Sequence, residues 1–224
     1  MIQNFKIIEK KNLTHDIFEI TFQWEKELTI KPGQFITFLL DKIGGRAYSI
    51  LEQKWDKTVL IIKKRETENG WRWGSKYICE REIWEELKAV GPAGHFVLQE
   101  NNLNKLFLWT GTWFVPLYNQ ILWNIEKNTD NKIKLIFWVR TKKDLFYISE
   151  LENLKKENSN FDFEIYLSAE KTEEYKKWYI TDFLTKQNLE DFQEFYICWA
   201  PAMIDSSNEI LKKIWKENVY FEKY

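Results

Sequence analysis

The sequence predicts two domains, an N-terminal antiparallel β-barrel over residues 1–100 and a C-terminal α/β domain with a parallel, Rossmann-like sheet over residues 101–224. The chain has 224 residues, which is enough for two small domains. Its first half contains short β-branched and aromatic segments separated by polar turns, whereas its second half alternates apolar strands with helical patterns. The polar stretch Glu100–Asn104, which contains three asparagines, marks the boundary between them.

The strand-like segments of the first half are short and spaced as in a small antiparallel barrel or sandwich. Turn signals stand at Pro32-Gly33 and Gly44-Gly45, and Gly91-Pro92-Ala93-Gly94 ends the run. The predicted strands are Phe5–Lys10, Ile17–Gln23, Gln34–Leu40 and Thr58–Lys63.

The second half has the alternation of βαβ units, which predicts a parallel sheet covered on both faces. The predicted strands are Lys105–Leu108, Lys132–Val139, Phe161–Leu167, Glu194–Cys198 and Val219–Phe221. The predicted helices are Val115–Glu126, Ser149–Lys156 and Ala202–Lys216.

Composition excludes several classes of protein. The net charge of −1 gives no overall field that would attract nucleic acid. No apolar run reaches the roughly 18 residues that span a bilayer, and the N-terminus lacks the apolar core of a signal peptide. We therefore expect a cytoplasmic protein with no nucleic-acid or membrane partner. Two cysteines and two histidines are too few for a disulfide framework or a four-cysteine cluster, so no metal site is predicted.

Two segments of the predicted barrel carry binding chemistry. Pro32-Gly33-Gln34-Phe35 is followed by Arg46-Ala47-Tyr48-Ser49-Ile50. An arginine offers a planar fork of donors to a pyrophosphate, a tyrosine ring can pack on a planar cofactor, and a serine can bond to its edge. Together they resemble the PGQF and RxYS signature of the ferredoxin–NADP reductase family. Arg46–Ser49 alone is equally compatible with a polar strand end that carries a surface arginine.

Further segments resemble this family in the same order, so that the resemblance covers essentially the whole chain. Gly70–Tyr77 resembles a glycine-rich turn that opens a helix and meets the second phosphate of FAD. Gly91–Phe96 resembles the turn at the end of the barrel, where we interpret His95 as structural. By resemblance, FAD is held by Arg46, Ala47, Tyr48, Ser49, Ile62, Lys63, Gly74 and Ser75.

In the second domain, Leu108–Pro116 lies between a strand and a helix and resembles the loop that carries the NAD(P)H pyrophosphate. Phe137–Thr141, Tyr196–Met203 and the C-terminal Phe221–Tyr224 also resemble family segments. The nucleotide residues implied by resemblance are Thr110, Gly111, Thr112, Pro116, Arg140, Ala200 and Pro201. The implied catalytic residues are Cys198 beside the nicotinamide, Glu222 as a proton relay and Tyr224 as a cover for the flavin.

The resemblance implies a flavoprotein oxidoreductase that passes a hydride from NAD(P)H to FAD, and electrons on to ferredoxin, flavodoxin or another acceptor. Two alternatives stay open. The chain could be a non-catalytic flavin-binding or protein-binding module, or an electron-transfer subunit of a larger complex. Simple packing remains an alternative role for Cys198, and a frayed terminus for Tyr224.

The choice of nucleotide depends on the 2′-phosphate of NADPH, which needs a nearby Arg or Lys. In NADP-using relatives a Ser-Arg segment often supplies it, but here the match is Ser168-Ala169-Glu170. The carboxylate repels a phosphate and favours NADH, whereas Lys171, Lys176 and Lys177 favour NADPH. We expect NADH to be preferred, with dual use left open.

Tryptophan is abnormally frequent and glycine abnormally rare. The chain has 12 Trp and 8 Gly, about half the usual glycine share of roughly 7%. The family pattern has glycine where this chain has tryptophan, and other tryptophans stand in turns or between strands. The positions with a family glycine are Trp71 or Trp73, Trp109, Trp113, Trp138 and Trp199; those in glycine-favouring turns or between strands are Trp84, Trp178, Trp215, Trp24 and Trp55.

An indole is poorly suited to a phosphate loop, where glycine lets a ligand approach the backbone. A shared cause is more economical than many separate changes. We hypothesise that the gene comes from an organism that reads UGA as glycine, while the printed sequence reads it as tryptophan. The remaining tryptophan, Trp123, fits this pattern least clearly. The alternative is that the indoles are genuine and fill core or interface sites.

Overall fold

The computed structural model describes residues 2–25, 29–65, 73–127, 130–177, 180–199 and 201–223, with Ile180, Trp199 and Lys223 described by their backbones. The chain divides into two compact units. Unit 1 comprises residues 1–98 and 118–120, and unit 2 comprises residues 99–117 and 121–224. Predictions that lie outside the described residues concern Gly70, Trp71, Trp178, Ala200 and Tyr224.

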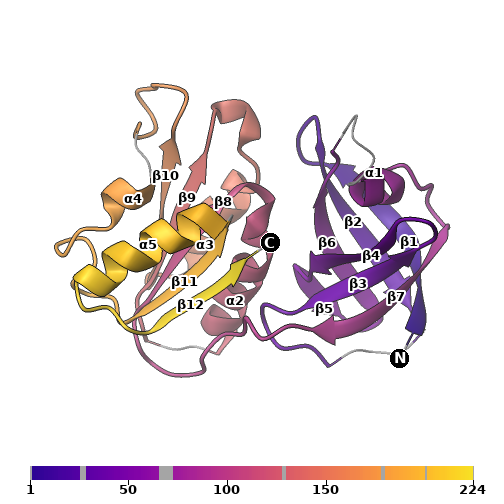
Figure 1. The fold of residues 1–224 in the computed structure, drawn as a ribbon, viewed down its shortest axis with the longest axis horizontal. Coiled ribbons are helices and arrows are strands. Elements are labelled where there is room, and N and C mark those ends of the chain that lie inside the picture. The colour runs from indigo at the N-terminus through magenta and orange to yellow at the C-terminus, as the bar shows by residue number, and fades with distance from the viewer. Residues whose placement is uncertain are drawn as a thin grey trace. The chain divides into compact units, whose positions relative to one another are not determined.

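Unit 1 contains a seven-stranded antiparallel sheet in the order β4-β3-β7-β1-β2-β6-β5 (Figure 1). Its elements are β1 (Ile2–Asn12), β2 (Ile17–Trp24), β3 (Phe35–Leu40), β4 (Gly44–Ser49), β5 (Glu52–Lys54), β6 (Lys57–Lys63), α1 (Trp73–Cys79) and β7 (Glu86–Ala93). The four strands predicted in this half are present. Gly44-Gly45 and Gly91–Ala93, which were interpreted as turns from the sequence, belong to strands β4 and β7.

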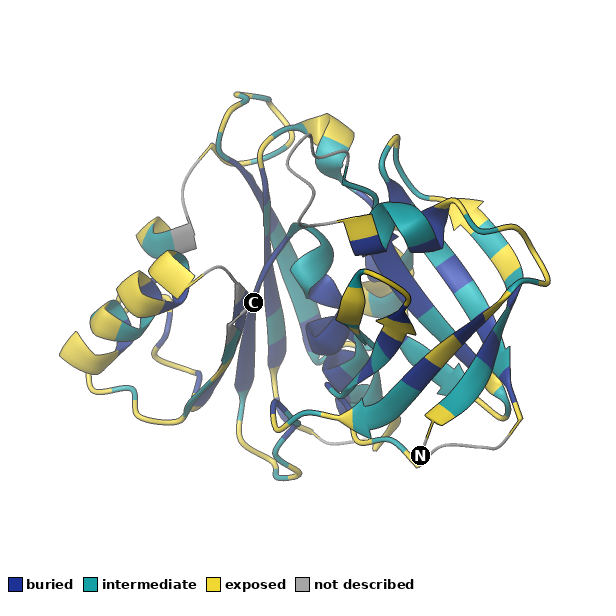
Figure 2. Ribbon diagram, turned by 45° about the vertical axis from the view of Figure 1, so that its right-hand side comes forward, coloured by how far each residue is buried: buried dark blue, intermediate teal, exposed yellow. Residues whose placement is uncertain are grey.

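The core of unit 1 comes from the inward-facing residues of these strands. Phe5, Phe22 and Phe38 are buried, with ring centroids 5.1–6.3 Å apart. Figure 2 shows this burial along the inner face of the sheet. Burying one such ring contributes about 1.5–3 kcal/mol, which explains why alternating apolar residues determine which face of each strand points inward.

Unit 2 contains a five-stranded parallel sheet in the order β10-β9-β8-β11-β12, so the predicted fold class is confirmed. Its first elements are β8 (Lys105–Thr110), η1 (Gly111–Phe114), α2 (Val115–Glu126), β9 (Ile133–Val139), η2 (Lys142–Asp144) and α3 (Ile148–Glu157). The rest are β10 (Phe161–Leu167), α4 (Ile180–Phe183), β11 (Glu194–Trp199), α5 (Pro201–Lys213) and β12 (Val219–Lys223).

Helix α5 covers one face of this sheet, which Figure 2 shows nearly edge-on. Its Ile204 and Leu211 pack in an apolar cluster with Leu108 of β8 and Ile197 of β11. The helix ends at Lys213, three residues before the end predicted from the sequence. Among the described residues, no helix is long and apolar enough to cross a membrane.

A buried polar cluster joins the starts of β8 and β11. The Lys105 ammonium lies 3.3 Å from Oε2 of Glu194, and these side chains are 0% and 2% exposed. Lys105 also donates to Oδ1 of Asn101 at 2.8 Å, while the Tyr196 hydroxyl donates to Glu194 at 2.9 Å. Burial lowers the pKa of Lys105, and the charge of Glu194 opposes that shift. The pair is therefore stable only while each charge keeps its partner.

We expect Lys105→Met to destabilise the protein by about 3–5 kcal/mol, because it leaves Glu194 as a buried, unpaired carboxylate. Urea unfolding measures the change. The control is Lys132→Met, which removes an ion pair to Asp191 whose side chains are 61% and 60% exposed, and whose loss should cost about 0–1 kcal/mol. Equal losses in the two variants would contradict the role given to the buried pair.

Candidate functional site

Unit 1 brings together two motif segments that are distant in the sequence. Arg46 lies on β4, opposite Phe38 of β3, and its side chain runs against the first turn of α1. A Cβ atom added to Gly74 would lie 2.5 Å from Cγ of Arg46. The close approach of the arginine leaves no room for a side chain at Gly74, and it brings the two segments into contact.

Helix α1 is held in place by contacts with strand β1 and with the segment that follows β6. Lys10 of β1 donates to the carbonyl oxygens of Cys79 and Arg81, at 2.6 Å and 2.8 Å, and so satisfies the end of the helix. Near the start, the Ser75 hydroxyl oxygen accepts a hydrogen bond from the Arg65 backbone N–H at 3.2 Å. These contacts fix the helix that carries Gly74. Lys10 could not be recognised from the sequence, because it contacts residues about 70 positions away.

The remaining flavin-site predictions of unit 1 differ in their surroundings. Tyr48 is half-buried, and burial raises the pKa of its phenol well above the usual range, so the ring stays neutral. Ala47 is exposed and Ser49 is half-buried. Ile62 is fully buried in the core. Lys63 forms an ion pair with Asp16 at 3.0 Å.

The loop of unit 2 has the predicted strand–turn–helix form. Strand β8 ends at Thr110, the 3₁₀ turn η1 follows, and Pro116 stands in the first turn of α2. Gly111 has φ +52°, a left-handed conformation that turns the chain out of the strand. Thr112 is half-buried in η1. In parallel sheets, ligands bind beside such loops at the carboxyl ends of the strands.

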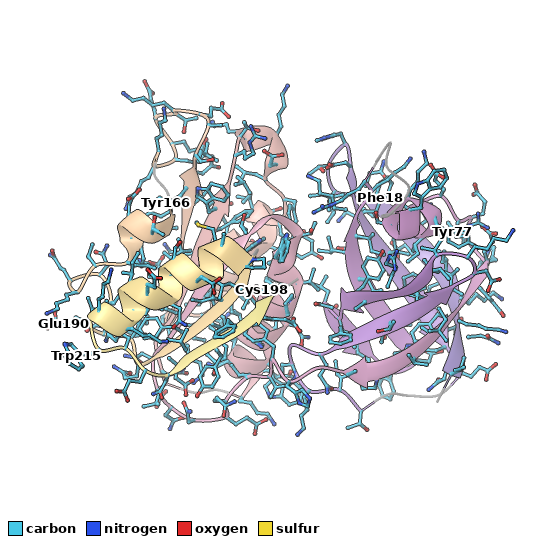
Figure 3. All side chains as sticks on the ribbon, viewed as in Figure 1. Phe18, Tyr77, Tyr166, Glu190, Cys198 and Trp215 are labelled. Atoms are coloured by element: carbon cyan, nitrogen blue, oxygen red, sulfur yellow. The ribbon has the colours of Figure 1, made fainter. Side chains whose placement is uncertain are left out.

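Parallel register places the two described catalytic candidates side by side. Cys198 of β11 pairs with Trp109 of β8 on one side and with Glu222 of β12 on the other. Figure 3 labels Cys198 within the sheet. The thiol is 0% exposed, and burial raises its pKa well above the usual range, with a further contribution from the charge of Glu222. Cys198 is therefore a neutral thiol in the folded protein.

Other predicted residues of unit 2 lie at the same edge. Arg140 follows the carboxyl end of β9 and is exposed, and Pro201 begins α5 and is exposed. Between Arg140 and α3, the carboxylate of Asp144 accepts hydrogen bonds from the backbone N–H and the hydroxyl of Thr141, at 3.0 Å and 2.9 Å. This capping box orders the loop after β9, and its Thr-x-x-Asp spacing was a signal available in the sequence.

The indole of Trp109 fills the start of the β8 loop. Its ring stacks on Phe114 and Phe137, with centroids 3.7 Å and 3.8 Å apart, and its Nε1 donates to the Gly111 carbonyl. Phe146 meets it edge-on at 5.7 Å. This aromatic cluster was not expected from the sequence, and it lies beside the predicted nucleotide residues.

Carboxylates occupy the end of β10. Glu170 accepts a hydrogen bond from the backbone N–H of Lys142 at 2.9 Å, and the Lys142 side chain pairs with Glu174 at 2.7 Å. Lys176, which sequence analysis considered as a phosphate ligand, pairs with Glu164 at 2.8 Å. The Glu170 carboxylate is therefore held in place beside the loop after β9.

Comparisons with known proteins place these features in context. Residues 107–209 match the family model of the oxidoreductase NAD-binding domain. One component of the Na⁺-translocating NADH-quinone reductase of Idiomarina loihiensis is 26% identical over 64% of this chain and 38% of its own length. The phenol hydroxylase P5 protein of Acinetobacter pittii is 25% identical over 100% of this chain and 66% of its own length.

Solved structures share the two-domain architecture. The cytochrome P450 reductase GcoB of Amycolatopsis has a TM-score of 0.88 at 18% identity, covering 100% of this chain and 69% of that one. The ferredoxin–NADP⁺ reductase of Plasmodium falciparum has a TM-score of 0.83 at 22% identity, covering 99% and 95%. The chain spans less than half the length of the quinone reductase component.

We expect neither cysteine to react with Ellman's reagent at pH 8 in the folded protein. Cys198 and Cys79 are 0% and 4% exposed, and burial raises the pKa of Cys79 to about 12. The nucleophile is the thiolate, whose population is negligible well below the thiol pKa. Both thiols should react in concentrated urea, which serves as the control. Rapid labelling of either thiol in the native protein would contradict this burial.

Proposed function

We propose, on the premise that the chain belongs to the ferredoxin–NADP reductase-type FAD- and NAD(P)-binding oxidoreductases, that it passes reducing equivalents from NAD(P)H to FAD and on to a further acceptor. The observation that carries the proposal is the close approach of Arg46 to Gly74. It joins the two segments that the resemblance assigns to one flavin. FAD, when bound, accepts a hydride and can release its electrons one or two at a time.

The residues of unit 1 fit an FAD pyrophosphate and ring. The Arg46 guanidinium can grip a phosphate through parallel hydrogen bonds. Gly74 has no side chain, whereas a Cβ atom at this position would collide with Arg46. Tyr48 adds a neutral aromatic surface because burial keeps its phenol protonated. The proposed contribution of this unit is therefore binding and orientation.

The residues of unit 2 fit the binding of a nicotinamide nucleotide. Thr110, Gly111 and Thr112 supply a loop at the carboxyl end of β8 for its pyrophosphate. Cys198, as a neutral thiol, would position the nicotinamide without adding a charge. Glu222, adjacent to it in register, would hold or pass a proton.

The proposed electron acceptor is a redox protein. Ferredoxin, flavodoxin or another redox protein would receive the electrons, because the chain itself has two cysteines and no set for a four-cysteine cluster. A second candidate role is that of an electron-transfer component in a larger assembly. It is supported by the relatives, since their names describe part of a quinone reductase and a phenol hydroxylase protein.

A non-catalytic module is the rival hypothesis, and it is supported by Trp109, whose buried stack with Phe114 and Phe137 lies beside the predicted nucleotide residues. Expression of the printed chain and of a chain with glycine at all 12 tryptophan positions separates the two hypotheses. The proposed oxidoreductase predicts a yellow, FAD-containing protein that oxidises NAD(P)H with an artificial acceptor. Absence of both properties in both chains would reject it.

Arg46→Ala, made in the glycine-substituted chain, should weaken FAD binding by about 1.5–3 kcal/mol, the range for a hydrogen bond to a charged group. The retained flavin should be FAD rather than FMN. Titration of the apoprotein with FAD measures the affinity. Lys54→Ala is the control, because Lys54 is 72% exposed on β5. Unchanged affinity in the Arg46 variant would remove this residue from the flavin site.

NADH should be preferred over NADPH, because Glu170 presents a fixed negative charge and Lys176 is paired with Glu164. Glu170→Gln should raise kcat/KM for NADPH by roughly tenfold, the equivalent of about 1.4 kcal/mol, and leave NADH nearly unchanged. Glu173→Gln, on the same exposed loop, is the control. A wild-type preference for NADPH above tenfold would overturn this assignment and implicate Lys176 or Lys177.

A further inference from the structure

Three tight turns have a tryptophan in the backbone conformation that favours glycine. Trp55, Trp84 and Trp215 have φ values of +57°, +79° and +64°. Five described non-glycine residues have positive φ, and the other two are Lys42 and Tyr147. A bulky residue in this region is an outlier, because its Cβ collides with the backbone. The concentration of tryptophan there needs an explanation specific to these positions.

The first turn joins β5 to β6. Lys54 pairs with Lys57, so Trp55-Asp56 is a two-residue hairpin loop. Of these two residues, Trp55 has positive φ and Asp56 does not. A two-residue hairpin with positive φ at its first central residue is the type II′ turn, which has glycine at that position. The geometry therefore requires Gly-Asp where the printed chain has Trp-Asp.

The second turn leads into β7. The backbone N–H of Glu85 donates to the carbonyl of Glu82 at 3.2 Å, which makes Ile83 and Trp84 the central residues of a β-turn. The positive φ lies on Trp84, the second of them. This is the pattern of a type II turn, whose second central residue has φ near +80° and is glycine or asparagine.

The third turn ends α5 and leads towards β12. The N–H of Lys216 donates to the carbonyl of Leu211 at 3.0 Å, and the N–H of Trp215 donates to that of Lys212 at 3.1 Å. These two bonds define a Schellman motif, in which the left-handed residue after the helix is usually glycine. Trp215 occupies that position; Figure 3 labels it beyond the end of α5.

The indoles at these turns gain little from packing. Trp55, Trp84 and Trp215 are 81%, 64% and 83% exposed, although the Lys6 ammonium lies 5.2 Å from the centre of the Trp84 ring. An exposed ring cannot offset backbone strain by burial. All three turn types thus favour glycine at this position, and none of the three exposed indoles is needed for packing.

Trp24, which is buried, and Trp123, which is half-buried, give independent support. The Nε1 atoms of Trp24 and Trp123 are buried without a hydrogen-bond partner among the described residues. A genuine buried indole N–H usually has such a partner. These positions accommodate the ring but leave its polar group unsatisfied.

We propose that the protein made in its own cells carries glycine at positions 55, 84 and 215 and, through the same codon, at the other nine tryptophan positions. UGA read as glycine in that organism accounts for all of them. At position 109, glycine would remove the indole between Phe114 and Phe137 and clear the space beside the β8 loop. The inference rests on backbone geometry and does not depend on the proposed function.

The decisive experiment compares the gene with the native protein. We expect UGA codons at 55, 84 and 215, and peptide masses from the source organism that contain glycine at each. UGG codons, or tryptophan-containing native peptides, would overturn the proposal.

A second experiment tests the backbone requirement in full-length protein. Glycine at positions 55, 84 and 215 should raise Tm by roughly 2–4 °C per position relative to the tryptophan chain. Alanine at the same three positions is the control, because it removes the exposed rings but keeps Cβ. Equal Tm values for the alanine and glycine variants would contradict a glycine requirement. Neither experiment uses activity, so failure of the proposed function would not affect them.

Discussion

The turns in which the backbone must enter the left-handed region set the limits of the elements around them. A residue with a Cβ atom is destabilised by about 1–2 kcal/mol in such a turn. The path of the chain therefore favours glycine at these positions. The turn at Trp84 directs the chain into β7, which lies between β1 and β3. The turn at Trp215 ends α5 and leads to β12, whose Glu222 lies beside Cys198. The candidate residue Glu222 is thus positioned by a turn that is distant from it.

Parallel register has the corresponding role inside the sheet of unit 2. Trp109, Cys198 and Glu222 lie in one row because β8, β11 and β12 are paired without a shift. A slip of one residue would turn each side chain to the opposite face. The apolar cluster that joins Leu108 and Ile197 to α5 opposes such a slip, because these alternate residues fill the other face. Packing on one face therefore holds the candidate site on the other.

Periodicity predicted most of the fold, because it depends on residues close in sequence. Phe161–Leu167 and Val115–Glu126 were predicted with their observed limits. Strands β4 and β7 were not predicted in full, because the glycines that they contain are typical of turns. Within the candidate site, the family resemblance assigned Arg46 and Gly74 to one flavin, and the two residues lie in contact. It could not predict the anchoring of α1 by Lys10 or the stack around Trp109, which exist only after distant segments meet.

The exposed and buried tryptophans pose different physical problems. At Trp55 and Trp215, strain without burial is enough to indicate glycine. Trp109 is fully buried between Phe114 and Phe137, so its local packing resembles that of a genuine core residue. At position 109, glycine is expected only because all the tryptophans are proposed to share one codon. In the glycine chain these rings would lose a stacking partner, and a nucleotide bound at the adjacent loop could restore contact. Ligand binding of that kind stabilises the folded state increasingly as the free ligand concentration rises.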